Sequence, residues 1–370
     1  MNPNADIRTV LTLDAGGTNF VFSAIQANRE ITEPVILPSN ADELSHCIET
    51  IEEGFQAVMS QLKQKPVALS FAFPGPSDYR TGVIGKLNNL PAFKGGIPLG
   101  PILRNKFNLP VFINNDGDLY AYGEALSGFL PHVNKLLSDS GIKKKYDNLV
   151  GLTLGTGFGG GIVRNEELLQ GDNSMSAEVW LLRNRINPDT NAEEGISIRA
   201  IRRVYATEAG IDFSQAPEPK EIYEIAVGKP KGSKEAAIKA FHELGRVLGD
   251  VLGNLLTVID GVAVIGGGLS GAMPLIFPSL IDEINSRYVS YAGKSYPRLV
   301  QKVYNIDDPK AVQDFLKWKE QIIEVPGSKE KISYYADARI PIGTSIIGTS
   351  KAISMGAYAY ALKRLDTSKF

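Results

Sequence analysis

One pattern occurs twice in this sequence: an apolar run, a glycine-rich turn and a second apolar run. The first copy covers residues 10–25 with its turn at residues 14–17, and the second covers residues 149–163 with its turn at residues 155–161. Each copy is typical of a strand, a turn and a strand. Because the copies lie far apart, the sequence predicts two domains of related architecture and not a short-period solenoid.

Strand and helix patterns alternate through the rest of the chain. Apolar residues recur at helical spacing over residues 41–62 and 234–258, and residues 118–128 are typical of a further helix. Buried strands are predicted at residues 66–73, 110–114 and 261–265. This alternation indicates an α/β fold with a mixed or mainly parallel sheet in each domain, in which ligands bind in crevices between strand ends and helices.

The composition narrows the function classes. Of 370 residues, 43% are hydrophobic and 22% are charged, which is typical of a soluble globular protein. A formal net charge of -2 gives no electrostatic reason to expect nucleic acid or a membrane as partner. A single cysteine, Cys47, excludes an intrachain disulfide and a thiolate metal cage. With no signal pattern and no membrane-spanning run, we expect a cytoplasmic protein.

The glycine turns suit phosphate groups, because glycine lets several backbone N–H groups converge without side chains in the way. Asp14 begins the first turn and Thr18 ends it, while residues 266–268 form a third glycine segment after a buried strand, where a flat ring or a ribose fits. One such turn alone is as well explained by a plain tight turn. Three of them after apolar strands favour a phosphate site. The lysine-containing phosphate loop and the dinucleotide fingerprint are both missing from their proper context.

Asp116 is the candidate general base. It follows the strand predicted at residues 110–114 and lies between Asn115 and Gly117. Taken alone, this sequence is typical of a turn. Phosphoryl transfer needs one carboxylate to accept the hydroxyl proton, so phosphate turns on both sides in sequence favour Asp116 as that base, with Asn115 orienting the substrate. Asp14 is either a turn residue or a carboxylate that holds a Mg²⁺-bound water.

These motifs together resemble the ROK family of sugar kinases, within the actin-like ATPase superfamily, from residue 11 to about residue 361. The resemblance implies Asp116 as the base and Glu178 as a sugar ligand. It adds Asn89, Asn115 and Glu193 as sugar ligands, with Glu194 competing for the place of Glu193. The implied ATP ligands are Asp14, Gly16, Gly17, Thr18, Asn19, Gly155, Thr156, Gly157, Gly266, Gly267 and Gly268.

Two departures from the family pattern are visible. The position where the family usually has a sugar-binding histidine is Leu181, and residues 188–195 contain no cysteine or histidine where many members carry a zinc loop. We therefore expect no zinc and no other protein-held metal. The segment at about residues 295–339 is longer than the family's usual run, rich in charge and aromatics, and either caps the site or forms an oligomer contact.

The resemblance implies an α/β protein of two domains with related actin-like, ribonuclease-H-like architecture and a ligand cleft between them. We expect an N-terminal domain at residues 1–130, a larger C-terminal domain at residues 131–347, and a small-residue-rich helix at residues 348–370 that returns to the first domain. A homodimer is also implied.

The expected activity is transfer of the γ-phosphate of ATP, with Mg²⁺, to a sugar hydroxyl, with the 6-hydroxyl of glucose as the first choice. An N-acetylhexosamine or fructose is the alternative acceptor. A protein of another class is the remaining alternative: a sugar-binding regulator that has lost catalysis, which the altered histidine position leaves open. Regulators of this family carry an N-terminal DNA-binding domain, which we do not expect here because only about ten residues precede Leu11.

Overall fold

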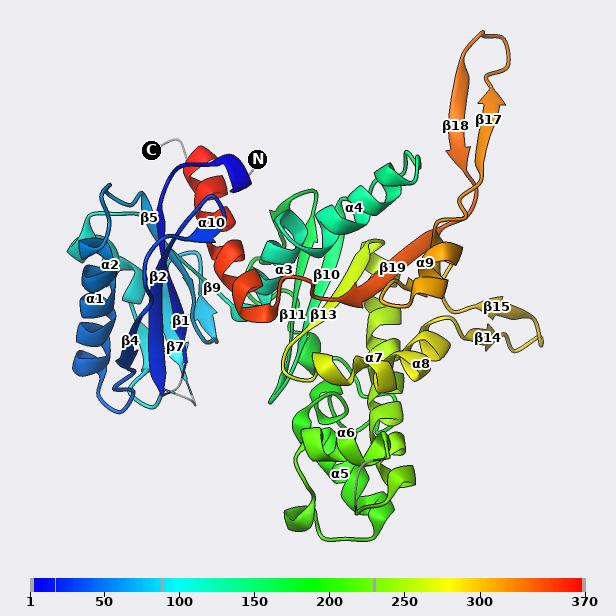
Figure 1. The fold of residues 1–370 in the computed structure, drawn as a ribbon, viewed down its shortest axis with the longest axis horizontal. Helices are drawn as coiled ribbons and strands as arrows, with labels where there is room; N and C mark the ends of the chain where they lie inside the picture. The colour runs from blue at the N-terminus through cyan, green and yellow to red at the C-terminus, as the bar shows by residue number, and fades with distance from the viewer. Residues whose placement is uncertain (1–2, 17, 88–89, 229–230, 368–370) are drawn as a thin grey trace. The chain divides into compact units, whose positions relative to one another are not determined.

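The computed structural model describes residues 3–16, 18–87, 90–228 and 231–367. The chain groups into two compact units (Figure 1). Unit 1 comprises Met1–Pro131, Gly160–Glu178 and Ile346–Phe370, and unit 2 comprises His132–Gly159 and Val179–Ser345. Residues 160–178 thus group with unit 1, whereas the predicted boundaries assigned them to the second domain.

The sheet of unit 1 has the order β3-β2-β1-β5-β9, with β4 paired to β2. Strand β1 (Val10–Ala15) pairs antiparallel with β2 (Asn19–Gln26) and parallel with β5 (Ala68–Ala72), which pairs parallel with β9 (Val111–Asn114). The carboxyl ends of β1, β5 and β9 therefore meet at one edge of the sheet. This topology brings the ends of the first glycine strand and of the strand before Asp116 to the same edge.

Helices cover both faces of this sheet because alternate strand residues point to opposite sides. Helix α1 (Leu44–Ser60) contributes Ile51 and Phe55 to a core with Phe22 and Phe71. On the other face, α10 (Thr349–Thr367) packs Tyr358 and Leu362 against strand residues such as Val10 and Ala68. Helix α2 is Leu99–Phe107 and the shorter strands are β3 (Arg29–Glu30), β4 (Val35–Pro38), β6 (Ser77–Asp78), β7 (Val83–Lys86) and β8 (Lys94–Ile97).

Helix α3 (Asp116–Leu126) crosses α10 at very short range. A Cβ on Gly123 would lie 1.9 Å from the carbonyl oxygen of Ala352, and one on Gly356 would lie 1.9 Å from that of Leu119. Only glycine allows two helix backbones to approach so closely. The small-residue helix predicted at the C-terminus therefore forms as expected and packs against the helix that begins with Asp116.

The second six-stranded sheet has the order β12-β11-β10-β13-β19-β16. Three neighbouring pairs in it are parallel. They are β10 (Asn148–Leu154) with β13 (Val262–Gly266), β13 with β19 (Arg339–Thr344), and β19 with β16 (Lys302–Asn305). As in unit 1, the glycine hairpin, here β10 with β11 (Phe158–Arg164), is extended by parallel strands, two in unit 1 and three here. The predicted α/β class and the related architecture of the two parts are confirmed.

The remaining elements lie mostly in unit 2. They are α4 (Phe129–Asp139), β12 (Glu167–Leu168), α5 (Ile198–Ala209), α6 (Pro219–Ala226), α7 (Lys234–Ile259), α8 (Met273–Ile284), β14 (Arg287–Val289), β15 (Ser295–Pro297), α9 (Pro309–Phe315), β17 (Glu320–Glu324) and β18 (Lys331–Tyr335). The long segment near residues 295–339 supplies the edge strand β16 and much of two projecting hairpins (Figure 1). Within the described residues, no helix combines the length and the apolar character that crossing a membrane requires.

Candidate functional site

Asp116 is the first residue of α3 and follows β9 by one residue. Asn115 is the N-cap: its side-chain oxygen accepts a hydrogen bond from the N–H of Gly117 at 2.8 Å, and Asp116 Oδ1 accepts from the same N–H at 2.8 Å. The predicted turn is therefore the start of a helix. A carboxylate in the first turn is favoured by the helix dipole.

Asp116 is exposed to solvent by its accessible area, although many protein atoms lie close around its carboxyl group. Burial by these atoms raises its pKa above the ordinary value, hydrogen bonds from backbone N–H groups lower it, and the charge of Asp14 raises it. Together these effects leave the pKa of Asp116 above its ordinary value. A carboxylate with a raised pKa is a stronger proton acceptor, and its exposed surface leaves room for a hydroxyl to reach it.

Asp118 is a feature that the sequence did not single out. It is 5% exposed, and within the described residues no hydrogen-bond partner reaches its Oδ1 atom. Burial and the negative charges of Asp116 and Glu178 raise its pKa to about 8. Asp118 is therefore a neutral acid below that pH, beside the candidate base. Its surroundings come from residues distant in sequence, so no local pattern marks it.

A chain of hydrogen bonds ties the segment before Glu178 to the edge of the unit 1 sheet. Gln170 donates through Nε2 to Oδ1 of Asn114 at 2.6 Å, and the hydroxyl of Tyr360 on α10 bonds Oε1 of Gln170 at 3.1 Å. Asn114 is fully buried at the end of β9. These contacts hold the segment that leads to Glu178 against the strand that leads to Asp116.

In the first glycine hairpin, Asp14 lies near the end of β1 and is exposed. It lines a cavity of about 580 Å³ together with Ser23, Arg29 and Lys351. A Cβ on Gly16 would lie 2.8 Å from the backbone oxygen of Asn19, so the turn itself requires glycine there.

The second glycine hairpin is held in shape from outside the turn. The carbonyl of Gly155 accepts from the N–H of Ile198 at 3.0 Å, and Glu193 Oε2 accepts from the N–H of Phe158 at 3.0 Å. Gly155 has open space where a Cβ would be, and Thr156 is exposed. Glu193, predicted as a sugar ligand, thus also fixes the backbone that follows Gly157.

Glu193 and Glu194 differ in their partners. Glu193 Oε1 accepts from Arg199 at 3.0 Å. Glu194 is bound by Arg203 at 2.8 Å and by Arg199 at 3.3 Å, and the hydrogen bond from Arg203 is the main cause of its lowered pKa. Glu194 is therefore engaged by two arginines, while Glu193 contacts the glycine hairpin. Leu181 is 58% exposed and offers no hydrogen-bond donor on its side chain.

The third glycine segment follows β13. Gly267 has φ +92° and a Cβ there would lie 2.2 Å from the oxygen of Leu154, so this position needs glycine for conformation and for packing. Gly268 faces open space. Leu269 donates its N–H to the oxygen of Leu154 at 3.1 Å, which connects this segment to the end of β10.

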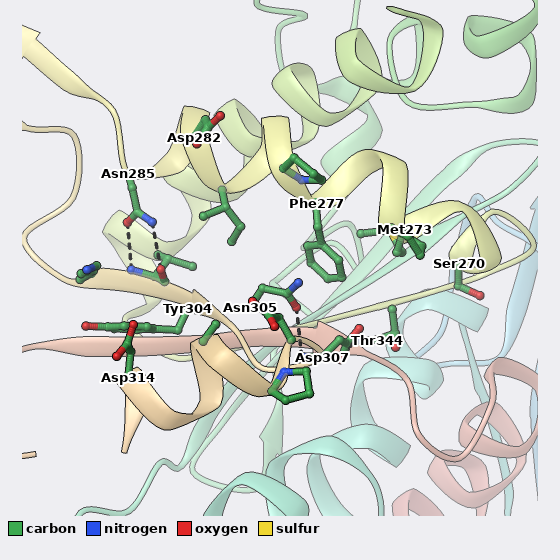
Figure 2. A pocket seen from close by; sticks show the side chains of 18 of the residues that line it. Ser270, Met273, Phe277, Asp282, Asn285, Tyr304, Asn305, Asp307, Asp314 and Thr344 are labelled. Carbon is green, nitrogen blue, oxygen red and sulfur yellow. Dashed lines mark hydrogen bonds between the residues drawn. The ribbon is translucent and has the colours of Figure 1, made fainter. Parts of the chain in front are cut away.

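A cavity of about 830 Å³ begins two residues later (Figure 2). Ser270, Met273 and Phe277 line it from the side of α8, while Asn305 and Thr344 mark the carboxyl ends of β16 and β19. The backbone N–H of Thr344 donates to the carboxylate of Asp307 at 3.0 Å. The lining combines apolar side chains with more carboxylates than cations, four aspartates (Asp282, Asp307, Asp308 and Asp314) against Lys302, which suits an uncharged group better than a phosphate.

The predicted residues thus fall on both units. Unit 1 contributes Asp14, Gly16, Thr18, Asn19, Asn115, Asp116 and Glu178, and unit 2 contributes Gly155, Thr156, Gly157, Glu193, Gly266, Gly267 and Gly268. Gly17 and Asn89 lie outside the described residues. In the part of the chain that the structure describes, no group of three or more histidine, cysteine, aspartate or glutamate residues is arranged to hold a metal ion.

The model of the ROK family matches residues 10–309. The chain belongs to the ROK family. This ROK protein is 50% identical to the glucokinase of Parabacteroides distasonis ATCC 8503, whose crystal structure aligns with a TM-score of 0.90 over 98% of this chain and 99% of that chain. The two-domain, actin-like α/β fold follows from this likeness.

Curated relatives of this ROK protein include kinases and repressors. It is 27% identical to the N-acetyl-D-glucosamine kinase of Vibrio cholerae over 78% of this chain and 92% of the kinase. It is 26% identical to the xylose repressor of Bacillus subtilis over 71% of this chain, a match that spans 64% of the repressor's own length. The relatives named as kinases support a sugar kinase and leave its sugar to be assigned.

Proposed function

We propose that this ROK protein transfers the γ-phosphate of MgATP to a hexose hydroxyl, with the 6-hydroxyl of glucose as first choice. An N-acetylhexosamine is the alternative acceptor, supported by the likeness to the Vibrio cholerae kinase. The observation that carries the proposal is Asp116, an accessible carboxylate with a raised pKa at the start of α3.

In this proposal, Asp116 accepts the proton of the attacking hydroxyl as the bond to phosphorus forms. Asn115, Glu178 and Glu193 bind the other sugar hydroxyls, and Asn89 is a further sugar ligand. Glu193 is preferred to Glu194 because its spacing to Ser197 matches the family's last sugar-binding glutamate and because it contacts the second glycine hairpin through the N–H of Phe158. With Leu181 at the usual histidine position, one donor to the sugar is missing, so selectivity among sugars depends more on the carboxylates.

The glycine segments are proposed to bind ATP. Backbone N–H groups of Gly16, Gly17, Thr18 and Asn19 and of Gly155, Thr156 and Gly157 receive the phosphates, and the hydrogen bond from Phe158 to Glu193 fixes the second turn. Gly266, Gly267 and Gly268 face the adenosine. The exposed carboxylate of Asp14 suits a water on Mg²⁺, an ion that neutralises phosphate charge when bound.

The test is ADP release with MgATP across glucose, fructose, mannose, N-acetylglucosamine and N-acetylmannosamine. We expect release that depends on one of these sugars. Release that is independent of every sugar contradicts the kinase proposal.

Asp116→Asn tests the assignment of the base. We expect kcat to fall by about 10²–10⁴-fold while sugar binding, measured by calorimetry, stays within a few fold. The matched control is Asp139→Asn, which changes an exposed aspartate paired with Lys135 on α4 and leaves turnover unchanged. Near-normal turnover of Asp116→Asn excludes Asp116 as the base.

A further inference from the structure

The hairpin of β17 and β18 is a two-stranded antiparallel sheet, and no other strand among the described residues pairs with either of its edges. Figure 1 shows it projecting from unit 2. Every residue of β17 is exposed, and so are the residues of β18 except Tyr335. A two-stranded hairpin is marginally stable in water without packing on another element. This hairpin should therefore gain stability from a further strand or another packing partner.

One face of the hairpin is apolar. The register pairs Ile323 with Ile332 and Gln321 with Tyr334, and residues directly opposite in an antiparallel pair share a face. Ile323, Ile332 and Tyr334 are 46%, 50% and 48% exposed. A contiguous apolar face of this kind marks an interaction surface.

The free edge of β18 has its backbone groups available. The N–H of Val325 donates to the carbonyl of Glu330 at 3.0 Å, which makes these two residues a hydrogen-bonded pair. Hydrogen-bonded and non-bonded pairs alternate along an antiparallel ladder. Lys331, Ser333 and Tyr335 therefore direct their N–H and C=O groups away from β17, toward the free edge.

The side chains of β18 are complementary to those of a second β18 that runs antiparallel. When two copies meet about a two-fold axis at Ser333, Lys331 faces Tyr335 of the second copy and Ile332 faces its Tyr334. These are cation–aromatic and aliphatic–aromatic pairs, and no like charges meet.

The other edges in this region are less suited to self-pairing. If two copies of β17 paired antiparallel about a two-fold axis at Ile322, Glu320 of each copy would lie opposite Glu324 of the other. These two like-charge pairs would repel. The second hairpin, of β14 and β15, has three residues per strand and ends β15 with Pro297, which has no N–H.

The base of the arm is fixed to unit 2, which makes its orientation definite. Lys143 forms an ion pair with Glu320 at 2.9 Å, and the Tyr335 ring contacts Trp318 edge-on with centroids 5.5 Å apart. An arm held in this way presents a preformed edge, and pairing then costs less conformational entropy.

We propose that β18 pairs antiparallel with β18 of a second copy of this chain, about a two-fold axis at Ser333, to form a four-stranded sheet shared by the two copies. Ile323, Ile332 and Tyr334 of both copies then form one continuous apolar stripe. On the opposite face, Lys331 keeps its own ion pair with Glu324 at 3.1 Å. This interaction surface is independent of the proposed kinase activity.

The first test is the mass of the full chain in solution by light scattering over a range of concentrations. Ser333→Pro removes an outward N–H and the hydroxyl that donates to Glu320 at 2.6 Å, and it leaves the backbone ladder to β17 intact. We expect it to halve the assembled mass and to weaken association by roughly a hundredfold. Ile322→Pro is the matched control, because it removes the equivalent outward N–H of β17, and its mass should equal that of the wild type.

The second test is a disulfide across the axis. In Ser333→Cys the two Cα atoms would lie about 5.5 Å apart, within reach of a disulfide, and the native Cys47 is buried. Oxidation should give a covalent dimer. In the control Lys331→Cys the two cysteines would be about 13 Å apart along the strands and should not cross-link.

Three results overturn the proposal. The first is a wild-type mass of one chain at every concentration, and the second is an unchanged mass for Ser333→Pro. The third is cross-linking of Lys331→Cys that equals that of Ser333→Cys. Circular dichroism of each variant confirms that the chain is folded in these measurements.

Discussion

The two glycine hairpins share a sequence pattern but differ in what holds them. At the tip of the first, Gly16 is required by the turn, since a Cβ would meet the backbone of Asn19 at 2.8 Å. At the tip of the second, Gly155 has open space, and Glu193 and Ile198 hold the backbone instead. Thus the same glycine pattern meets a conformational need in unit 1 and leaves free access in unit 2.

The carboxylates near the two hairpins also differ. In unit 1, Asp118 is buried beside Asp116, no ion pair reaches it from the part of the chain that the structure describes, and its pKa is raised. In unit 2, Glu193 and Glu194 are bound by arginines, and the pKa of Glu194 is lowered. Asp116 and Asp118 therefore resist ionisation, while Glu194 near the second hairpin ionises more readily than an ordinary glutamate. Four predictions test this contrast.

The largest effect is expected from Glu193→Ala. It leaves the N–H of the buried Phe158 without its acceptor and removes a proposed sugar ligand, so kcat/KM should fall by about 10²–10³-fold. Glu194→Ala is the control and should cost less than about tenfold, because the polar contacts that the described residues give Glu194 are with arginines and with the cap of its own 3-10 helix. Steady-state kinetics with both substrates measure this. Equal losses for the two variants would remove the distinction between the two glutamates.

Gly16→Ala and Gly155→Ala separate the two glycine roles. Gly16→Ala should lower the free energy of unfolding by about 1–3 kcal/mol, because a backbone atom lies in the way. Gly155→Ala should change it by less than about 0.5 kcal/mol yet raise the KM for ATP by about tenfold. Urea unfolding and ATP titration give both values. A loss of stability in Gly155→Ala as large as in Gly16→Ala would contradict the contrast.

Asp118→Asn tests the buried acid through pH. The folded state keeps the proton of Asp118 up to a pKa of about 8, whereas the unfolded chain loses it above about 3.8. The folded state thus binds more protons between these values, and its stability falls as the pH rises through them. The variant should therefore be more stable than the wild type by roughly 1–3 kcal/mol near pH 8 and no different below pH 4. Equal stability at pH 8 would show that Asp118 ionises without cost.

Glu194→Gln should lower the stability of the fold at neutral pH, opposite in sign to Asp118→Asn, and its effect should be the smallest of the four. The pKa of Glu194 is lowered from 4.5 by Arg203, so its contribution is present above that pH and is lost as the pH falls through the lowered value. Because the pair with Arg203 is partly exposed, solvent screens it, and the variant should lose less than about 1 kcal/mol at neutral pH. Thermal melts at several pH values measure the difference. A greater loss at acid pH than at neutral pH would contradict the sign.

The strands next to the glycine turns were predictable because their apolar residues are consecutive. Residues 10–13 and 149–154 form strands as predicted, within a residue or two at their ends. Helix α3 begins two residues before the predicted start at residue 118. The reason is that Asn115 caps the helix, so the residues expected to form a turn are its first turn. The glycines from Gly159 to Gly161 were read as a turn but belong to β11. They are small because a Cβ on Gly161 would meet the Gly117 backbone oxygen at 2.6 Å.

The unpredicted features depend on partners distant in sequence. The raised pKa of Asp118 comes from its burial and from the charges of Asp116 and Glu178, and no local sequence pattern indicates that burial. The segment at residues 295–339 showed no clean period because its hairpin strands have only three to five residues, too few for a periodic signal. Its one buried strand, β16, has four residues, too few for a periodic signal.

The crossing of α3 and α10 also bears on how the chain folds during synthesis. Unit 1 is assembled from the beginning, the middle and the end of the sequence, and α10 supplies Tyr358 and Leu362 to its core. A ribosome makes about 5–20 residues per second, so the first strands wait for α10 until the residues of unit 2 have been made. Unit 2 ends at Ser345 and has all its strands earlier. We therefore expect unit 2 to fold first on the ribosome, with the nascent N-terminal sheet as the part most in need of a chaperone.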